Sequence, residues 1–146
     1  MIENIHDHYT DEEILKLQIE PDSLRWKEML EFNDTEIDFL QSLLFYNLTE
    51  KVNPDMKNNQ RLLKKLDSIK EANETQLNQL LNFRKDLYKF RECDEVACEN
   101  KYLKDFYTLK QVLTQHFRDF RDLKKMIFIF FGKGFENKFE QKTYFI

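Results

Sequence analysis

Three histidines, His6, His8 and His116, are the residues of this chain best suited to bind a metal ion or transfer protons. Helical di-metal sites use Glu-x-x-His pairs, because residues i and i+3 place both ligands on one face of a helix. The residue three positions before His116 is Leu113, so this motif is absent. His6 and His8 could hold a metal only weakly in their polar terminal segment. We therefore expect no metal site and no cofactor, and interpret His116 as lying at the boundary of an apolar helix face.

Cys93 and Cys98 are the only two cysteines. On a continuous helix, residues five apart are separated by about 140° and ~7.5 Å along the axis, too far for an unstrained disulfide. A bend in the chain would allow them to meet. A zinc site would need two further ligands, and no second cysteine pair exists. We interpret both as buried or spectator thiols, reduced as is usual in the cytoplasm.

No catalytic constellation is recognisable. Nucleophilic catalysis needs a serine or cysteine, a histidine and an acid brought together. Ser42 and Ser68, the only serines besides Ser23, have ordinary helical neighbours, and acidic pairs such as Glu12 and Glu13 are typical of solvated helix faces. Neither glycine belongs to a phosphate-binding loop motif. The sequence therefore predicts a protein that is not an enzyme and implies no small-molecule substrate.

The elements that position these residues are predicted to be long helices, because only two glycines and two prolines are present to form turns. A short helix is expected over 11–19. Pro21 suits the first turn of a first long helix, which ends near Val52. Its apolar spacing is interrupted at Asn33, where capping residues favour a break or a kink. Asn53, as N-cap, and Pro54 then predict the start of a second long helix, which ends near Phe90.

The third helix has the most regular pattern. Asp94 can cap it, and Gly132 and Gly134 are expected to end it through a left-handed C-terminal cap. Spacings of three and four indicate a helix that packs along its whole length. Its apolar stripe is Leu103, Phe106, Leu109, Leu113, Phe117, Phe120, Leu123, Ile127 and Phe130. The stripe of the second helix is Leu63, Leu66, Ile69, Leu77, Leu80, Phe83 and Leu87, thin between Asn73 and Gln79.

Short connections force neighbouring helices to run antiparallel. We therefore predict an all-α fold, an up-down-up antiparallel bundle of three long helices with coiled-coil-like spacing. Residues 1–146 are expected to form a single domain, with an acidic N-terminal segment over 1–20 and an irregular aromatic tail over 132–146. The N-terminal residues show no signal peptide, and no stretch is apolar over the ~18 residues of a membrane span. A cytoplasmic location is the resulting expectation.

Charge is unevenly distributed along the chain. Residues 1–50 contain 13 acids and 3 bases, whereas residues 101–146 contain 5 acids and 10 bases. We favour an acidic first helix lying against a basic third helix over a surface for an anionic partner. The basic residues Arg118, Arg121 and Lys125 share a helix face that Asp119 and Asp122 dilute, so nucleic-acid binding is disfavoured.

Apolar residues are in excess where the first and third helices end. The first helix is rich in them from Phe39 to Leu48, and the third from Met126 to Phe131. Six consecutive apolar residues surround a helix, so Met126 and Ile129 should lie off the buried stripe and need cover. The cover could be another segment of this chain, a second copy, or a foreign partner. Our candidate partner-binding residues are Met126, Phe128, Ile129, Phe131, Phe135 and Phe139.

The sequence thus favours a non-catalytic interaction protein that acts through self-association or through binding a partner protein at this aromatic-rich region. The alternative is a peripheral membrane protein. Lys124 and Lys125 directly precede the apolar run, as in a short anchor for anionic lipid. Against this alternative, the basic and apolar residues follow one another along the helix, and do not form two opposed faces.

Overall fold

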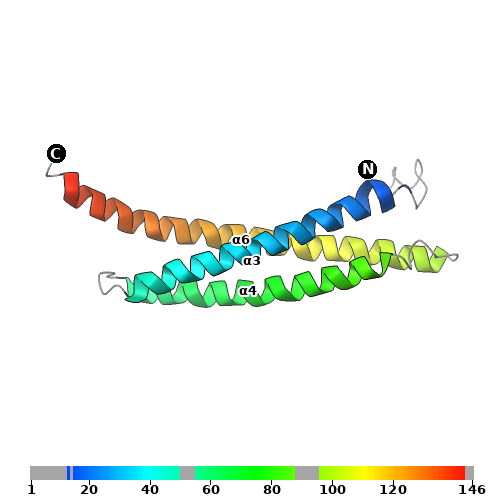
Figure 1. Cartoon of the computed structure of the whole chain (residues 1–146), viewed down its shortest axis with the longest axis horizontal. Helices are drawn as coiled ribbons and strands as arrows, with labels where there is room; N and C mark the ends of the chain where they lie inside the picture. Colours follow the sequence, from blue (N-terminus) through cyan, green and yellow to red (C-terminus); the bar gives the residue numbers. More distant parts are fainter. Residues whose placement is uncertain (1–12, 14, 50–54, 88–95, 144–146) are drawn as a thin grey trace. The chain divides into compact units, whose positions relative to one another are not determined.

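The computed structural model describes residues 13, 15–49, 55–87 and 96–143, and all of these are helical except Asp55 and Asp86. A single π-helical turn, η1 (Leu15–Ile19), leads into α3 (Glu20–Thr49). Two more long helices follow, α4 (Met56–Lys85) and α6 (Val96–Thr143) (Figure 1). No strand occurs within the described ranges. The prediction of an all-α fold with three long helices is confirmed.

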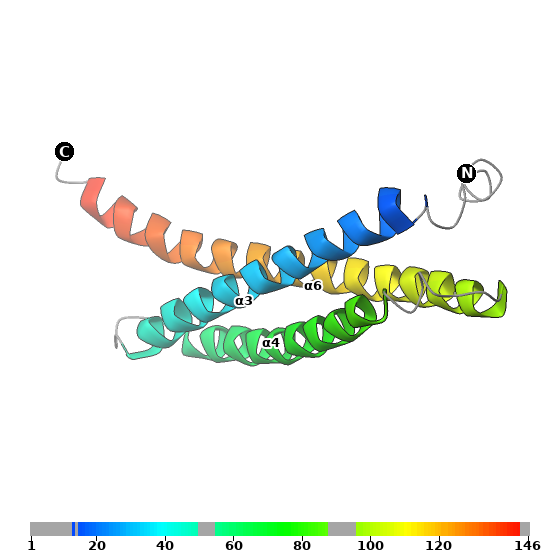
Figure 2. The same cartoon turned by 45° about the vertical axis from the view of Figure 1, so that its right-hand side comes forward.

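The helices divide into two compact units, and each long helix contributes to both. Unit 1 combines residues 1–34 with 73–115, and unit 2 combines residues 35–72 with 116–146. Contacts between α3 and α4 show their relative direction in unit 2, because Asp38 pairs with Lys70 whereas the later residue Leu44 pairs with the earlier residue Asn59. These two helices are therefore antiparallel. The third helix, α6, follows the direction of α3, which gives the predicted up-down-up order (Figure 2).

Aromatic packing forms the core of unit 1. Trp26 of α3 stacks on Phe106 of α6, with ring centroids 5.3 Å apart, and Phe83 of α4 approaches the same ring at 6.2 Å. Phe106 has no exposed surface. Its ring joins the three helices of this unit, because it lies on α6 and contacts one aromatic ring of α3 and one of α4. Aromatic pairs at these separations add to the stabilisation that burial alone provides.

Aliphatic side chains dominate the core of unit 2. One cluster draws buried residues from all three helices, namely Ile37, Leu40, Leu44, Leu62, Leu66, Phe120, Leu123 and Ile127. On α3 and α6 these residues recur at intervals of three and four, as expected for one buried face of a helix. The predicted stripes of the second and third helices supply their members of the cluster except Leu62, which is buried next to the half-buried Leu63.

The first helix differs from its prediction at two places. Its helical backbone passes from η1 into α3 with no turn between them, so 15–19 is not part of a separate short helix. Pro21 is the second residue of α3 and directly follows the π-helical turn, so the place where proline interrupts the regular hydrogen-bond pattern coincides with the change from π- to α-helix. The helix also continues through Asn33, so a break there is wrong, whereas a kink stays a prediction. Asn33 lies on the buried face of the helix, so its polar side chain neither ended the helix nor turned the residue toward solvent.

The second helix begins two residues later than the cap prediction implied. The carbonyl oxygen of Asp55 accepts a hydrogen bond from the N–H of Asn59, which makes Asp55 the residue that precedes the first helical turn. Its carboxylate also accepts a hydrogen bond from Nδ2 of Asn58 at 2.6 Å. The helix ends at Lys85, five residues before the expected end near Phe90. Asn53, Pro54 and Asp94 lie outside the described residues.

The glycines do not end α6, which corrects the prediction of an irregular tail. The helix extends through Gly132 and Gly134 to Thr143, and no glycine in the described part of the chain has a positive φ. Glycine costs only about 1 kcal/mol in a helix interior, less than the surrounding helix can supply. The end of the tail, residues 144–146, lies outside the described residues.

Candidate interaction surface

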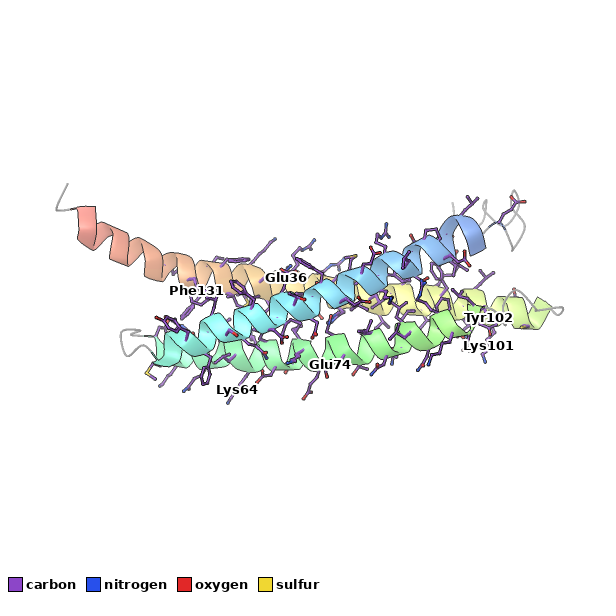
Figure 3. All side chains as sticks on the ribbon, in the orientation of Figure 1. Glu36, Lys64, Glu74, Lys101, Tyr102 and Phe131 are labelled. Carbon is purple, nitrogen blue, oxygen red and sulfur yellow. The ribbon has the colours of Figure 1, made fainter. Side chains whose placement is uncertain are left out.

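A charged contact fixes α6 beside α3 in unit 2. Nζ of Lys124 lies 3.2 Å from Oε2 of Glu36, and both side chains are about one quarter exposed. The same ammonium group lies 4.7 Å from the centroid of the Phe120 ring, within range of a cation–π interaction. Figure 3 labels Glu36 on α3 and Phe131 on α6. This pair is one instance of the predicted contact between an acidic first helix and a basic third helix.

The face of α3 opposite the core of unit 2 carries large apolar side chains. Phe39, Phe45 and Tyr46 are each more than 60% exposed, and Leu43 is about one third exposed. Full burial of such a side chain is worth about 1.5–3 kcal/mol, so this surface forgoes an amount comparable to a large part of a domain's stability. The region that the sequence identified as overloaded is therefore only partly covered within the chain.

On α6, the six candidate partner-binding residues divide into three groups. Phe128 and Ile129 are 62% and 59% exposed. Met126 and Phe131 are half-buried and pack against the core cluster of unit 2, and Phe131 also contacts the ring of Phe130 at 5.6 Å. Phe135 and Phe139 lie within the bounds of α6.

Unit 1 exposes apolar side chains of α3 that the sequence analysis did not identify. Phe32 is 63% exposed, and Leu24 and Met29 are about two fifths exposed. Phe32 precedes Phe39 by one heptad, and Tyr46 follows by another. The seven-residue spacing of these aromatic residues could have indicated an exposed apolar row. It could not be distinguished in the sequence, because the buried stripe of the same helix has the same period.

We define the apolar surface as the exposed residues of unit 2 given above, Phe39, Leu43, Phe45 and Tyr46 of α3 with Phe128 and Ile129 of α6. Arg118, Arg121 and Lys125 of α6 are exposed in the same unit. Lys124 is not equivalent to them, because it is half-buried and paired with Glu36. Between Arg118 and Lys125, the exposed basic groups available to an anionic ligand are therefore the other three.

In the part of the chain that the structure describes, the groups with potential chemistry do not converge. His116 is buried at 6% exposure, its ring centroid lies 5.9 Å from that of Phe117, and burial lowers its pKa although Asp119 opposes the shift. Within the described ranges no three His, Cys, Asp or Glu side chains are grouped closely enough to hold a metal ion. The arrangement offers packing surfaces, and we find no set of groups there for proton transfer or nucleophilic attack.

Cys98 is disulfide-bonded, so its interpretation as a spectator thiol is wrong. It is half-buried and lies in the first turn of α6, which begins at Val96. The continuous-helix geometry that argued against a bridge does not apply at a helix start. Cys93 lies outside the described residues.

Comparison with known proteins yields no relative: no protein-family model, no curated protein and no solved structure matches the chain. In the described part of the chain, none of the helices combines the length and the apolar character needed to cross a membrane. The properties of the apolar surface are therefore the basis for any functional proposal.

Proposed function

We propose that this chain is a non-catalytic interaction protein that binds another helical polypeptide, or a second copy of itself, through the apolar surface of unit 2. The observation that carries the proposal is the exposure of Phe39, Tyr46 and Phe128, each above 60%, beside a well-packed core. Large exposed apolar patches commonly mark protein–protein contacts, and aromatic residues are enriched in the centres of such interfaces. The core needs none of these side chains for its own packing.

Partner capture by the immobilised full chain, with reversible crosslinking, tests this proposal. The wild type is expected to retain one polypeptide in stoichiometric amount, either itself or another protein. The variants Phe39→Asp/Tyr46→Asp and Phe128→Asp/Ile129→Asp should each lose it. Val112→Asp is the matched control, because Val112 is 40% exposed on α6 in unit 1 and lies outside the apolar surface. The proposal would be overturned if every polypeptide that the wild type retains were also retained by the two variants.

A second candidate function is binding to an anionic membrane surface through α6. It is favoured by one observation, that exposed Arg121 and Lys125 lie next to exposed Phe128 and Ile129 on the same helix. Basic and apolar groups together bind anionic lipid surfaces. Flotation with vesicles containing phosphatidylserine, comparing wild type with Arg121→Glu/Lys125→Glu, tests it. Binding that is absent, or unaffected by the variant and by salt, would exclude this function.

A cytoplasmic location remains part of the proposal, and the disulfide of Cys98 bears on it directly. Disulfides are rare in the cytoplasm of most organisms because reducing systems keep thiols free. Mass spectrometry of protein that has been alkylated inside intact cells would decide the point. An alkylated Cys98 supports the cytoplasmic location, whereas a protected one argues for an oxidising compartment.

A further inference from the structure

The exposed face of α6 in unit 2 has basic residues at its beginning and apolar residues at its end. Arg118, Arg121, Lys125 and Phe128 follow one another at steps of three, four and three residues, and all four are exposed. Ile129 adjoins Phe128 and is 59% exposed. This spacing places the five residues on one face of the helix, which we call the α6 basic face. Within the described ranges, no acid forms an ion pair with its three bases.

The exposed face of α3 in unit 1 has apolar residues first and acidic residues after them. Leu17, Pro21, Leu24, Glu28 and Glu31 follow one another at steps of four, three, four and three residues, and all five are exposed. Leu17 belongs to η1, whose helical backbone continues into α3. We call these five residues the α3 acidic face. They all lie in unit 1, as the residues of the α6 basic face all lie in unit 2.

We propose that the α6 basic face of one copy of this chain binds the α3 acidic face of a second copy, with the two helices antiparallel. The inference rests on the proposed function, because Phe128 and Ile129 belong to the apolar surface, and it names a second copy as the partner. The two faces in contact are different, so the assembly is head-to-tail, and each copy offers one face of each kind.

The order of residues along the two faces favours the antiparallel orientation. One register sets Glu28 opposite Arg121 of the partner, and the remaining residues then meet in turn. The further pairs are Glu31 with Arg118 of the partner, Leu24 with Lys125 of the partner, and Pro21 with Phe128 of the partner. Opposite charges thus meet at one end of the contact and apolar groups at the other. A parallel pair would bury the acids against apolar side chains, which costs free energy because those carboxylates would lose water without gaining a partner.

The apolar end of this register also brings a large side chain against a small residue. Leu17, which is 67% exposed, lies at the level of Gly132 of the partner. A Cβ atom added to Gly132 would have no neighbour within 4 Å, so the backbone of α6 is accessible there. A large residue that faces a small one fills the space between two helices without overlap.

The charges of the two segments that would meet are complementary. From Leu17 to Asp34 the chain contains five acids and two bases, a balance of −3. From Arg118 to Lys133 it contains five bases and two acids. Lys124 is one of these bases and is already paired with Glu36, which leaves four bases against two acids, a balance of +2. Opposite charges favour the encounter of these two faces, and they disfavour contacts between two α3 acidic faces or two α6 basic faces.

The bases of α3 do not cancel this complementarity. Arg25 and Lys27 lie within 3.4 and 3.5 Å of Asp22 and Glu31 in their own helix. Exposed ion pairs of this kind are weak, so Glu31 can also approach a base of a second copy. Within the described ranges Glu28 forms no ion pair, and it therefore gains most from a basic partner.

Charge reversal and its rescue test this contact, through sedimentation and light scattering of the full chain at several concentrations. The wild type is expected to associate, and Arg118→Glu/Arg121→Glu and Glu28→Arg/Glu31→Arg should each raise the Kd of association at least about tenfold. An equimolar mixture of the two variants should associate again, because every α3 face then meets an α6 face of opposite charge. Lys64→Glu/Lys65→Glu reverses two exposed bases of α4 in unit 2 and is the matched control, expected to associate as the wild type does.

A photo-reactive benzoylphenylalanine at position 17 tests the orientation, in a mixture of ¹⁴N- and ¹⁵N-labelled chains. Crosslinked peptides that join the two isotopes should contain position 17 and the region around Gly132. A parallel pair with the same charges aligned would instead crosslink position 17 to the region around Lys110 of the partner, and this result would overturn the antiparallel orientation. Crosslinks that never join the two isotopes would overturn the contact between copies.

A monomeric wild type would overturn this inference, and so would two reversal variants whose mixture fails to associate. A monomeric chain that binds vesicles of phosphatidylserine through Arg118 and Arg121 would assign the α6 basic face to lipid instead. The proposed function would still stand if the chain captured a different polypeptide through the apolar surface. It would fail separately if nothing that the chain retains depends on that surface.

Discussion

Nδ2 of Asn59 donates a hydrogen bond to the backbone oxygen of Leu44 at 2.8 Å, from a side chain with no exposed surface. Unit 1 repeats this relationship, because Nδ2 of Asn73 donates to the backbone oxygen of Leu30 at 2.9 Å. In both cases an amide of α4 reaches a carbonyl of α3 through an otherwise apolar face. A buried polar group of this kind finds its hydrogen-bond partner in only one alignment of the two helices. It therefore specifies that alignment.

We expect Asn59→Ala to lower the free energy of unfolding by about 1–3 kcal/mol, since it removes a buried hydrogen bond and leaves a cavity. Urea denaturation followed by circular dichroism measures this change. Gln60→Ala is the matched control, because Gln60 is the exposed neighbour of Asn59, and its effect should stay within about 0.5 kcal/mol. Equal effects of the two substitutions would contradict the role assigned to Asn59.

The buried imidazole of His116 should make stability depend on pH. Burial lowers its pKa below the ordinary value of 6.5 in the folded chain, whereas the unfolded chain keeps that ordinary value. Above pH 6.5 the group is neutral in both states and contributes nothing. As the pH falls below 6.5 the unfolded state takes up the proton first, so stability is lost until the pH passes the folded-state pKa.

Urea midpoints at pH 7.5 and pH 5.5 test this expectation. The wild type should lose stability between the two values, and His116→Gln, which cannot titrate, should lose less. The interval lies above the range where most carboxylates titrate, so their contribution is small. A variant with the same pH dependence as the wild type would show that His116 is not the responsible group.

Phe106 should be the most sensitive position in unit 1, because its ring contacts Trp26 and Phe83 and is fully buried. Phe106→Ala is expected to cost about 3–5 kcal/mol through the cavity that it leaves. Phe32→Ala changes the same residue type on the exposed face of α3 and should cost far less. Thermal unfolding at a concentration where the chain is monomeric separates this effect from any loss of association.

The buried faces could be predicted because they follow the helical period. On α6, all nine residues of the predicted stripe are buried except Phe117 and Phe130, which are half-buried. The asparagines could not be assigned in this way. Asn33 and Asn73 were interpreted as interruptions of their stripes, yet both are buried. Whether a buried amide finds a partner depends on a carbonyl of another helix, and one helix's periodicity carries no information about that.

The sequence predicted where exposed apolar residues would lie better than it predicted which residues would be exposed. The sequence near Phe39 and near Phe128 contains more apolar residues than one helix face can bury, and this excess indicated the location. Met126 was expected off the buried stripe but packs against the core cluster. Side chains at the margin of a stripe are placed by the spacing of the neighbouring helices. The periodicity of α6 alone does not fix that spacing.

Gly132 provides a test of the corrected end of α6. A glycine that ends a helix has a positive φ, and alanine there would be strained. Gly132 instead has no positive φ, and a Cβ atom added to it would have no neighbour within 4 Å. Gly132→Ala should therefore stabilise the helix by up to about 1 kcal/mol, because alanine loses less backbone entropy than glycine. Urea denaturation should show a higher midpoint, and far-ultraviolet circular dichroism should show helicity that is equal or greater. A lower midpoint together with a loss of helicity would restore the interpretation of Gly132 as the residue that ends the third helix.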